Sequence, residues 1–399
     1  LTRSTVQIQR SKMDTFNLRS DTVTRPTAAV RAAMAGAVVG DDAHGDCPTT
    51  KALEARAAAL TGKAAAAFVC SGVQGNLASI LAYTEQRGSE VICGDKAHIM
   101  LHEGGGCAAL AGAMMRTLPV REDGTWDLAQ LEAAIRTSDD PMFPRTRAVC
   151  VENTHCALGG RAVPLHWCRE VKRIAAERGV CVHMDGARLF NAAAQLGCTA
   201  ADVAACADSV TFSLSKGLGG PCGSVVCGPA DFINKVRRAR KMLGGTMHQV
   251  GVLAAAGLEV LKGPDVLSQA RRDHANAARL AEMINALEDA PNGEVEGGLP
   301  AQSERPRRLT AEWPGTNMIY VHCDGQRLSA SAMLREMDSR GLLAFALSST
   351  TIRLVVHYEV GEADVPGIAQ RIGEAAAAGE VRGVAAAAEE HSYGSWNTN

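Results

Sequence analysis

The 399-residue sequence has few aromatic residues, almost no net charge and no closely paired cysteines. Its 41 basic and 43 acidic side chains give a formal net charge of −2 and are scattered along the chain, which argues against binding to nucleic acid or to a membrane surface. The 13 cysteines are odd in number and no two form a C-x-x-C pair, so a zinc ribbon, a thioredoxin motif and a disulfide framework all lose support. We expect reduced thiols in a reducing compartment. No stretch approaches the roughly 18 consecutive apolar residues of a membrane span.

The start of the chain leaves two interpretations of its location open. Residues 1–12 contain Arg3, Arg10 and Lys12 and no acidic residue. This segment is either the remnant of an organellar transit peptide or an added segment ahead of a natural start at Met13. We expect a cytoplasmic protein, and an organellar one if residues 1–12 are a transit-peptide remnant.

Strand and helix patterns alternate through most of the chain and predict an α/β protein. Arg147–Glu152 has the pattern of a short buried strand, Leu165–Arg178 that of an amphipathic helix ending at Gly179, and Val180–Asp185 that of a second strand. A strand, a crossover helix and a strand in so few residues predict a mostly parallel central sheet flanked by helices. Residues 209–214 and 223–227 continue the strand pattern.

The length predicts two domains, with a change of character near residue 265. Helical, charged sequence continues to about Leu287, and residues 288–312, rich in Pro, Gly and charges, predict an exposed loop or insertion. Strands near 317–322 and 352–356 and helices near 329–340 and 364–378 predict a smaller α+β domain. The predicted units are an N-terminal segment, 1–26, which carries Ser20 and packs near the small domain, a large domain, 27–265, a small domain, 266–390, and a polar tail, 391–399.

Asp185 and Lys216 stand where two predicted strands end, and each is followed by small residues. Ligands of open α/β sheets gather at the carboxyl ends of the strands. A lysine and a carboxylate there suit pyridoxal phosphate, because the lysine can hold the cofactor covalently and the carboxylate can keep its pyridine nitrogen protonated. The alternative is a strand-end Asp that caps the next helix and a surface Lys in a glycine loop.

Residues 70–76 could form the phosphate end of such a site. Ser71, Gly72 and Val73 follow an apolar run and precede a helical pattern. Backbone N–H groups at a glycine-rich helix start bind phosphate without a particular side chain. Glycine-rich turns between a strand and a helix are usually only turns, so this signal is weak by itself.

Several ordered motifs resemble those of the L-threonine aldolases, pyridoxal-phosphate enzymes with the aspartate-aminotransferase type of fold. The resemblance covers about residues 16–380. The motifs are Asn17–Pro26, Val39–Asp42, Ser71–Gly72 with Gly75–Asn76, Glu152–His155, Gly159–Arg161, His183–Arg188, Ser213–Gly219, Arg240–Gly245 and Ile352–His357.

The resemblance implies a role for each site residue. Lys216 would hold the cofactor, Asp185 its pyridine nitrogen, and His98 would stack on the ring as a neutral imidazole, while His155 would accept the proton of the substrate's β-hydroxyl, with help from His98 or a water. The other implied residues are Ser71, Gly72, Val73 and Arg188 at the cofactor, Lys241 and His248 at a neighbouring subunit's phosphate, and Ser20, His102, Arg188 and Arg353 at the substrate. Two arginines suit a carboxylate, because a planar guanidinium can bind two oxygens.

Several positions depart from the family pattern around the cofactor or the subunit contact, among them Asp46 and Cys47, which stand where Glu and Asp are usual. Val73 replaces a Thr, His248 an Arg, His44 a Tyr and His102 a Tyr or another large residue, and Cys156 begins a segment that is usually polar. These departures make the scaffold and the lysine more secure predictions than the substrate.

The resemblance implies cleavage of L-threonine or L-allo-threonine to glycine and acetaldehyde by a dimer or tetramer with active sites near the subunit interface. An alanine racemase on the same scaffold is the main alternative, with His102, His44 or Cys156 as a second proton donor. A non-catalytic, oligomer-forming relative is the remaining one. The small net charge of the chain fits a small amino-acid substrate.

A metal site is not predicted. His98 and His102 are four residues apart and Glu103 follows them. Their spacing is not that of H-E-x-x-H, and no further ligand for the two histidines to share is evident.

Overall fold

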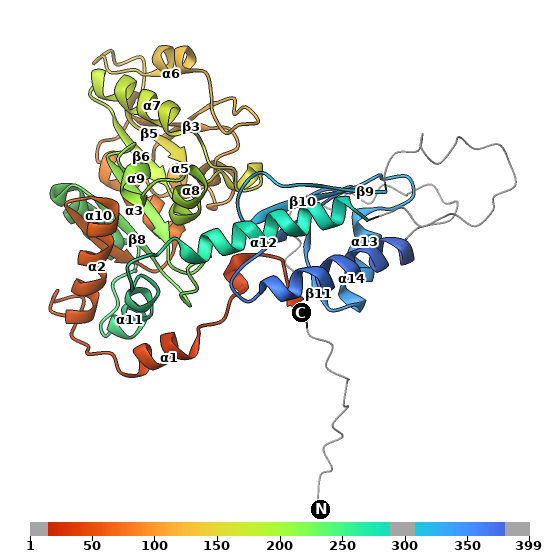
Figure 1. The fold of residues 1–399 in the computed structure, drawn as a ribbon. Coiled ribbons are helices and arrows are strands. Elements are labelled where there is room, and N and C mark those ends of the chain that lie inside the picture. Colours follow the sequence, from red (N-terminus) through yellow and green to blue (C-terminus); the bar gives the residue numbers. More distant parts are fainter. Residues whose placement is uncertain (1–14, 288–307, 380–399) are drawn as a thin grey trace, which may run out of the picture.

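The computed structural model describes residues 15–287 and 308–379, which form a large lobe and a smaller one (Figure 1). The helices are α1 (Ala28–Ala35), α2 (Pro48–Thr61), α3 (Gly72–Tyr83), α4 (His98–Leu101), α5 (Gly106–Ala109), α6 (Leu128–Ala134), α7 (Leu165–Glu177), α8 (Leu189–Leu196), α9 (Ala200–Ala204), α10 (Ala230–Met242), α11 (Gly251–Val260), α12 (Ser268–Asn285), α13 (Ala330–Ser339) and α14 (Val365–Ala378). The strands are β1 (Phe16–Asn17), β2 (Ala65–Val69), β3 (Ser89–Gly94), β4 (Met114–Leu118), β5 (Arg145–Glu152), β6 (Cys181–Asp185), β7 (Ser209–Ser213), β8 (Ser224–Gly228), β9 (Leu309–Glu312), β10 (Met318–Cys323), β11 (Leu342–Leu343), β12 (Phe345–Ala346) and β13 (Thr351–Val355).

The large lobe is built on a seven-stranded sheet with the order β2-β8-β7-β6-β5-β3-β4. Strands β7, β6, β5, β3 and β4 are parallel to one another, whereas β8 is antiparallel to both β2 and β7. Helix α7 connects β5 to β6, as its one apolar face of Trp167, Val171 and Ile174 predicted. The mostly parallel α/β fold is therefore confirmed.

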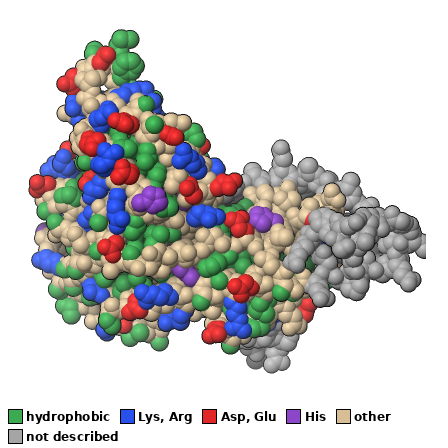
Figure 2. Space-filling model, turned by 45° about the horizontal axis from the view of Figure 1, so that its top comes forward, with side chains coloured by type: hydrophobic (Ala, Val, Ile, Leu, Met, Phe, Trp, Pro, Cys, Tyr) green, Lys and Arg blue, Asp and Glu red, His purple; other side chains and the backbone are tan. Residues whose placement is uncertain are grey.

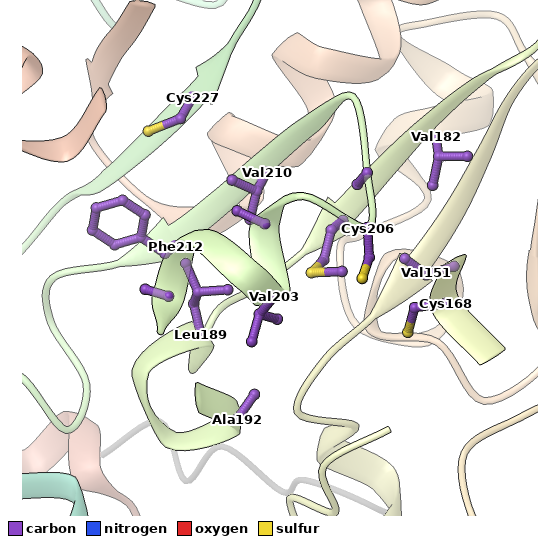
Figure 3. Packing of buried hydrophobic residues seen from close by; sticks show 14 of the residues in the cluster. Val151, Cys168, Val182, Leu189, Ala192, Val203, Cys206, Val210, Phe212 and Cys227 are labelled. Carbon is purple, nitrogen blue, oxygen red and sulfur yellow. The ribbon is translucent and has the colours of Figure 1, made fainter. Parts of the chain in front are cut away.

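Alternation of side chains along the strands separates two cores. Val210 and Phe212 of β7 face one side of the sheet and pack with Leu189 of α8 and Val203 of α9 in the main apolar cluster (Figure 3). Side chains on the other face of the sheet, such as Ala67 and Val69 of β2, face α3 and α10 instead. The same alternation places Thr211 beside Gly75 of α3. Polar residues at these positions therefore lie between the sheet and α3.

The small lobe has an antiparallel sheet with the order β12-β13-β10-β9, covered by α12, α13 and α14. Helix α12 extends from the large lobe to the small one (Figure 1). The N-terminal segment joins the small lobe, because β1 pairs with β11 and Leu18 lies in its apolar cluster. The domain boundaries themselves stay predictions.

Residues 309–312 correct the prediction of an exposed loop. They form β9, which pairs with β10, and the side-chain amide of Asn285 bonds both backbone groups of Ala311 at 2.8 Å. Pairing with a distant strand outweighs the local Pro and charge signal. Residues 1–14, 288–307, 380–390 and the predicted tail 391–399 lie outside the described part.

The surface and the thiols agree with the composition. Basic and acidic side chains are interspersed on the face shown in Figure 2. All 13 cysteines fall within the described residues and are free thiols, and 8 of them are buried. No helix in the described segments is long and apolar enough to cross a membrane.

Candidate active site

Lys216 and Asp185 lie at the carboxyl ends of neighbouring parallel strands. Asp185 is the last residue of β6 and is buried, and Lys216 follows β7 by three residues. Burial lowers the pKa of Lys216, the Arg188 charge adds to this effect, and the carboxylates of Asp185 and Asp21 oppose it. A lowered pKa increases the fraction of Lys216 that is in the neutral, nucleophilic amine form, relative to a free lysine.

Asp185 is held by two N–H donors. Its Oδ1 accepts the backbone N–H of Ala187 at 3.0 Å, and its Oδ2 accepts the side-chain amide of Asn76 at 3.0 Å. Asn76 lies on α3, on the side of the sheet to which His183 and Asp185 both point because they are two residues apart on one strand. These contacts hold the carboxylate in a fixed orientation with acceptor capacity left over.

His98 is placed by two carboxylates. Its Nδ1 lies 2.9 Å from Oε1 of Glu103, and its backbone N–H donates to Oε2 of Glu152 at 2.7 Å. Burial lowers the pKa of His98, but the Glu103 hydrogen bond and the charges of Asp185, Glu103 and Glu152 outweigh it and raise the pKa above its ordinary value. The neutral state of the ring stays a prediction.

His155 is buried at 2% exposure just after β5, and its Nδ1 has no hydrogen-bond partner within residues 15–287 and 308–379. Burial lowers its pKa to about 4, although the charge of Asp185 acts in the other direction. Its ring is therefore neutral at physiological pH and able to accept a proton. Glu152 also holds this segment, because its Oε1 accepts the backbone N–H of Cys156 at 2.7 Å.

The predicted carboxylate-binding residues come from three parts of the chain. Arg188 is buried and donates Nε and Nη2 to Asp21 at 2.8 and 2.7 Å, which leaves Nη1 4.0 Å from the Cys156 sulfur. Arg353 of β13 donates Nη2 to the carbonyl of Arg19 at 3.3 Å. Ser20 precedes Asp21, and its Oγ accepts the backbone N–H of Thr22 at 3.2 Å. The N-terminal segment thus brings these three predicted residues to one region.

Ser71 is the N-cap of α3 and Gly72 its first residue, so both stand at a helix start as predicted. The Oγ of Ser71 accepts the backbone N–H of Gln74 at 3.1 Å and caps the helix, while the side chain of Val73 is 38% exposed. The free N–H groups of this first turn favour an anion.

The remaining predicted residues are exposed. His102 lies directly after α4, and its ring centroid is 5.5 Å from that of His98. Lys241 is near the end of α10, and Nδ1 of His248 is 3.0 Å from Asp41 of the same chain. The substrate role of His102 and the roles of Lys241 and His248 toward a second subunit stay predictions.

The structure supplies a metal-like cluster that the sequence did not indicate. One ligand atom each of His98, Glu103 and Asp185 lie within 4.8 Å of one another. The amide nitrogen of Asn76, however, is 2.8 Å from Glu103 Oε1 and 3.0 Å from Asp185 Oδ2. An N–H donor already serves both carboxylates, so the donor set suits a hydrogen-bonded site better than a cation.

The residues present fit pyridoxal phosphate. A partly buried lysine of lowered pKa, a fixed carboxylate on the neighbouring strand and a capped helix start with free N–H groups match its aldehyde, its pyridine nitrogen and its phosphate. Lys216, Asp185 and residues 71–73 would hold it.

Sequence analysis assigned no role to five polar residues that the structure places around this site: Asp21, Asn76, Glu103, Glu152 and His183. All but Glu103 stand within the motifs that carry the resemblance, and two had a further signal. His183 and Asp185 share one face of a buried strand, and Asp21 follows Ser20 directly. The contacts of Asn76, Glu103 and Glu152 depend on tertiary packing.

Comparison with known proteins agrees with this geometry. Residues 17–297 match the model of the beta-eliminating lyase family. The chain is 42% identical over 355 residues to low-specificity L-threonine aldolase 1 of Arabidopsis thaliana, which covers 88% of this chain and 94% of the relative. It is 38% identical over 354 residues to the low specificity L-threonine aldolase of Escherichia coli K12, covering 89% and 97%.

A solved structure shares the fold. The threonine aldolase of Leishmania major superposes with a TM-score of 0.73 at 19% identity and covers 90% of this chain and 99% of its own. At this identity the likeness supports the fold alone. On the family match and the two relatives, the chain belongs to the beta-eliminating lyase family as a homologue of the low-specificity L-threonine aldolases.

Proposed function

We propose that this protein is a pyridoxal-phosphate-dependent aldolase that cleaves L-threonine and L-allo-threonine to glycine and acetaldehyde. The observation that carries the proposal is the placement of Lys216 and Asp185 on neighbouring strand ends in a chain 42% identical to an L-threonine aldolase. When bound, the cofactor supplies an electron sink for the bond that breaks at the substrate's α-carbon.

Arg188 and Arg353 bind the substrate carboxylate, with Ser20 beside them. Arg188 is fixed by Asp21 through Nε and Nη2, so Nη1 is the nitrogen that remains for the ligand. Holding the carboxylate selects which bond at the α-carbon is aligned for cleavage. The buried ion pair of Arg188 and Asp21 therefore contributes to the orientation of the substrate as well as to its affinity.

His155 accepts the proton of the β-hydroxyl. Its Nδ1 has no partner in the described part of the chain, and burial keeps the ring unprotonated above about pH 5 because its pKa is about 4. A neutral imidazole is competent as a base at once, without first losing a proton.

The test is to incubate the holoenzyme with L-threonine and, separately, with L-alanine in heavy water. Release of acetaldehyde from L-threonine supports the aldolase, and deuterated D-alanine without aldehyde would establish the racemase instead. The Lys216→Ala variant is expected to lose aldehyde release, whereas Lys262→Ala, exposed on the surface, keeps it. Retained turnover in Lys216→Ala would overturn the mechanism.

The enzyme also forms a dimer or a tetramer in this proposal. Large apolar side chains are exposed on the large lobe, and a groove of about 610 Å³ with His44, Lys51 and Lys241 in its lining lies nearby. The exposed side chains are Val38, Val39, Met100, Leu101, Leu110, Met114, Met242 and Val252. A second copy would remove these side chains from water.

Sedimentation tests the assembly. The Val38→Glu/Met242→Glu variant is expected to shift toward the monomer, whereas Met142→Glu, also exposed, keeps the wild-type state. A wild-type monomer would contradict the proposal.

The 13 free thiols support a reducing compartment such as the cytoplasm, which cell fractionation tests.

A further inference from the structure

The buried side chain of Asn76 contacts two of the acids around the site, Asp185 and Glu103, and a histidine. Its Nδ2 lies 3.0 Å from Asp185 Oδ2 and 2.8 Å from Glu103 Oε1, and its Oδ1 lies 3.2 Å from His183 Nε2. An amide nitrogen carries two hydrogens, so Asn76 can donate one to each carboxylate. Ionised carboxylates only accept hydrogen bonds, so with both acids ionised these contacts also fix which atom of the amide is the oxygen.

The residues behind Asn76 are consistent with only one direction of hydrogen bonding. Burial lowers the pKa of His183 to about 4, so its ring is neutral and carries one N–H. Because Asn76 Oδ1 is an acceptor, that hydrogen is on Nε2. His183 Nδ1 then accepts from Ser209 Oγ at 2.8 Å, and Ser209 Oγ accepts from the hydroxyl of Tyr83 at 2.8 Å. Burial raises the pKa of Tyr83, which keeps its hydroxyl a donor.

The same reasoning fixes the ring of His98. Glu103 Oε1 accepts from Asn76 and also lies 2.9 Å from His98 Nδ1. Nδ1 therefore carries the hydrogen, and Nε2 is the nitrogen that can gain or lose a proton. The backbone N–H of His98 is held independently by Glu152, so the residue is fixed at two points.

We propose that Asn76 is a positioning residue that ties Asp185 to Glu103 and, through Glu103, sets the tautomer and orientation of His98. Asp185 and His98 come from strand β6 and helix α4, far apart in the sequence, and the amide of Asn76 is the link between them. The proposal rests on the proposed function for its purpose, which is to hold Asp185 and His98 in a fixed position relative to each other at the cofactor. The hydrogen-bond pattern can be measured without activity.

Nitrogen-15 NMR of histidine-labelled protein tests the proposal, in the cofactor-free protein and in the holoenzyme. The signals of His98 are assigned by their loss in His98→Gln. The wild type is expected to show His98 with its hydrogen on Nδ1. In Asn76→Leu, which has a similar size and no donor, and in Glu103→Gln, which has the same shape and no charge, the Nδ1–H signal is expected to shift and broaden.

The dissociation constant of pyridoxal phosphate, measured by equilibrium dialysis, is expected to rise about tenfold or more in Asn76→Leu, as the loss of a hydrogen bond to a charged group predicts. Ser79→Ala is the matched control, because it removes a buried hydrogen bond from the same helix, to the Gly75 carbonyl at 2.8 Å, outside the network. It is expected to change neither measurement.

Two results would overturn the positioning role. One is a wild-type His98 with its hydrogen on Nε2, which needs no variant. The other is an unchanged Nδ1–H signal in folded Asn76→Leu. A wild type that lacks aldehyde release but shows the Nδ1 tautomer would contradict the proposed function and leave this inference standing.

Discussion

Arg188 and Asp21 form a buried two-point ion pair that joins the N-terminal segment to the end of β6. Nε donates to Oδ2 at 2.8 Å and Nη2 to Oδ1 at 2.7 Å, and Asp21 is fully buried. Asn317 of the small lobe lies 3.4 Å from the same carboxylate. The orientation of the carboxylate-binding arginine therefore depends on three separate parts of the chain.

Asp21→Asn is expected to destabilise the fold and to weaken substrate binding. Removing one partner leaves the Arg188 charge buried without compensation, which costs about 3–5 kcal/mol in the free energy of unfolding. The KM for L-threonine should rise about tenfold, because Nη1 loses its fixed direction. Urea denaturation and steady-state kinetics measure the two effects.

The pH dependence of the stability provides a control for the effect of Asp21→Asn. Although burial opposes it, the Arg188 charge lowers the pKa of Asp21 to about 2 from an ordinary 3.8. The carboxylate thus contributes about 2 kcal/mol above pH 4, and this is lost as the pH falls from about 4 to 2. The difference between wild type and Asp21→Asn should shrink over that window, and a constant difference would contradict the ion pair's role.

The sequence predicted the scaffold because its signals are local. The apolar periodicity of α7, the short strand pattern of β6 and the glycine-rich start of α3 all depend on neighbours along the chain. They place Asp185 and Ser71 at element ends, where the structure has them.

The network around Asn76 could not be predicted in this way. Asn76 appears in the sequence as one of several polar residues in helix α3, and its partners Glu103 and Asp185 are 27 and 109 residues away. Only the close packing of α3 on the sheet brings them together. Long-range packing also explains why β9 was mistaken for a loop.

His155→Ala is expected to separate catalysis from binding. Loss of a general base lowers kcat by about 10²–10⁴, whereas glycine, which has no β-hydroxyl, should bind within about threefold of the wild-type affinity. Because the pKa of His155 is about 4, the wild-type kcat should show no loss of this base between pH 6 and 8. Rapid aldehyde assays and glycine titration measure both quantities.

The exposed His166 of α7 provides the control, because His166→Ala removes an imidazole outside the site. Equal losses of cleavage and glycine binding in His155→Ala would contradict its role as the base.

Gly75→Ala is expected to displace α3 from the sheet. An added Cβ would lie 2.6 Å from Thr211 Cγ2 and 3.2 Å from Val226 Cγ2. Overpacking of this kind costs about 1–3 kcal/mol, and the shift would move both Ser71 and Asn76, so the affinity for pyridoxal phosphate should fall as well. Gly367→Ala is the matched control in α14, since nothing lies within 4 Å of its added Cβ, and it should be neutral or stabilising. Equal stability of the two variants would contradict the close contact.

Asp273→Asn is expected to remove a pH dependence of stability. Asp273 is 1% exposed on α12, its Oδ1 accepts Gln269 Nε2 at 2.7 Å, and its Oδ2 has no hydrogen-bond partner in the described part of the chain. Burial, helped by the Asp21 charge, raises its pKa to about 7 from an ordinary 3.8. The folded protein therefore keeps a proton that the unfolded chain releases, and stability falls by about 4 kcal/mol as the pH rises from 4 to 7. Urea denaturation at several pH values should show Asp273→Asn gaining this amount relative to wild type, whereas the exposed Asp338→Asn gains nothing. A difference that stays constant with pH would show that Asp273 is ionised in the folded protein.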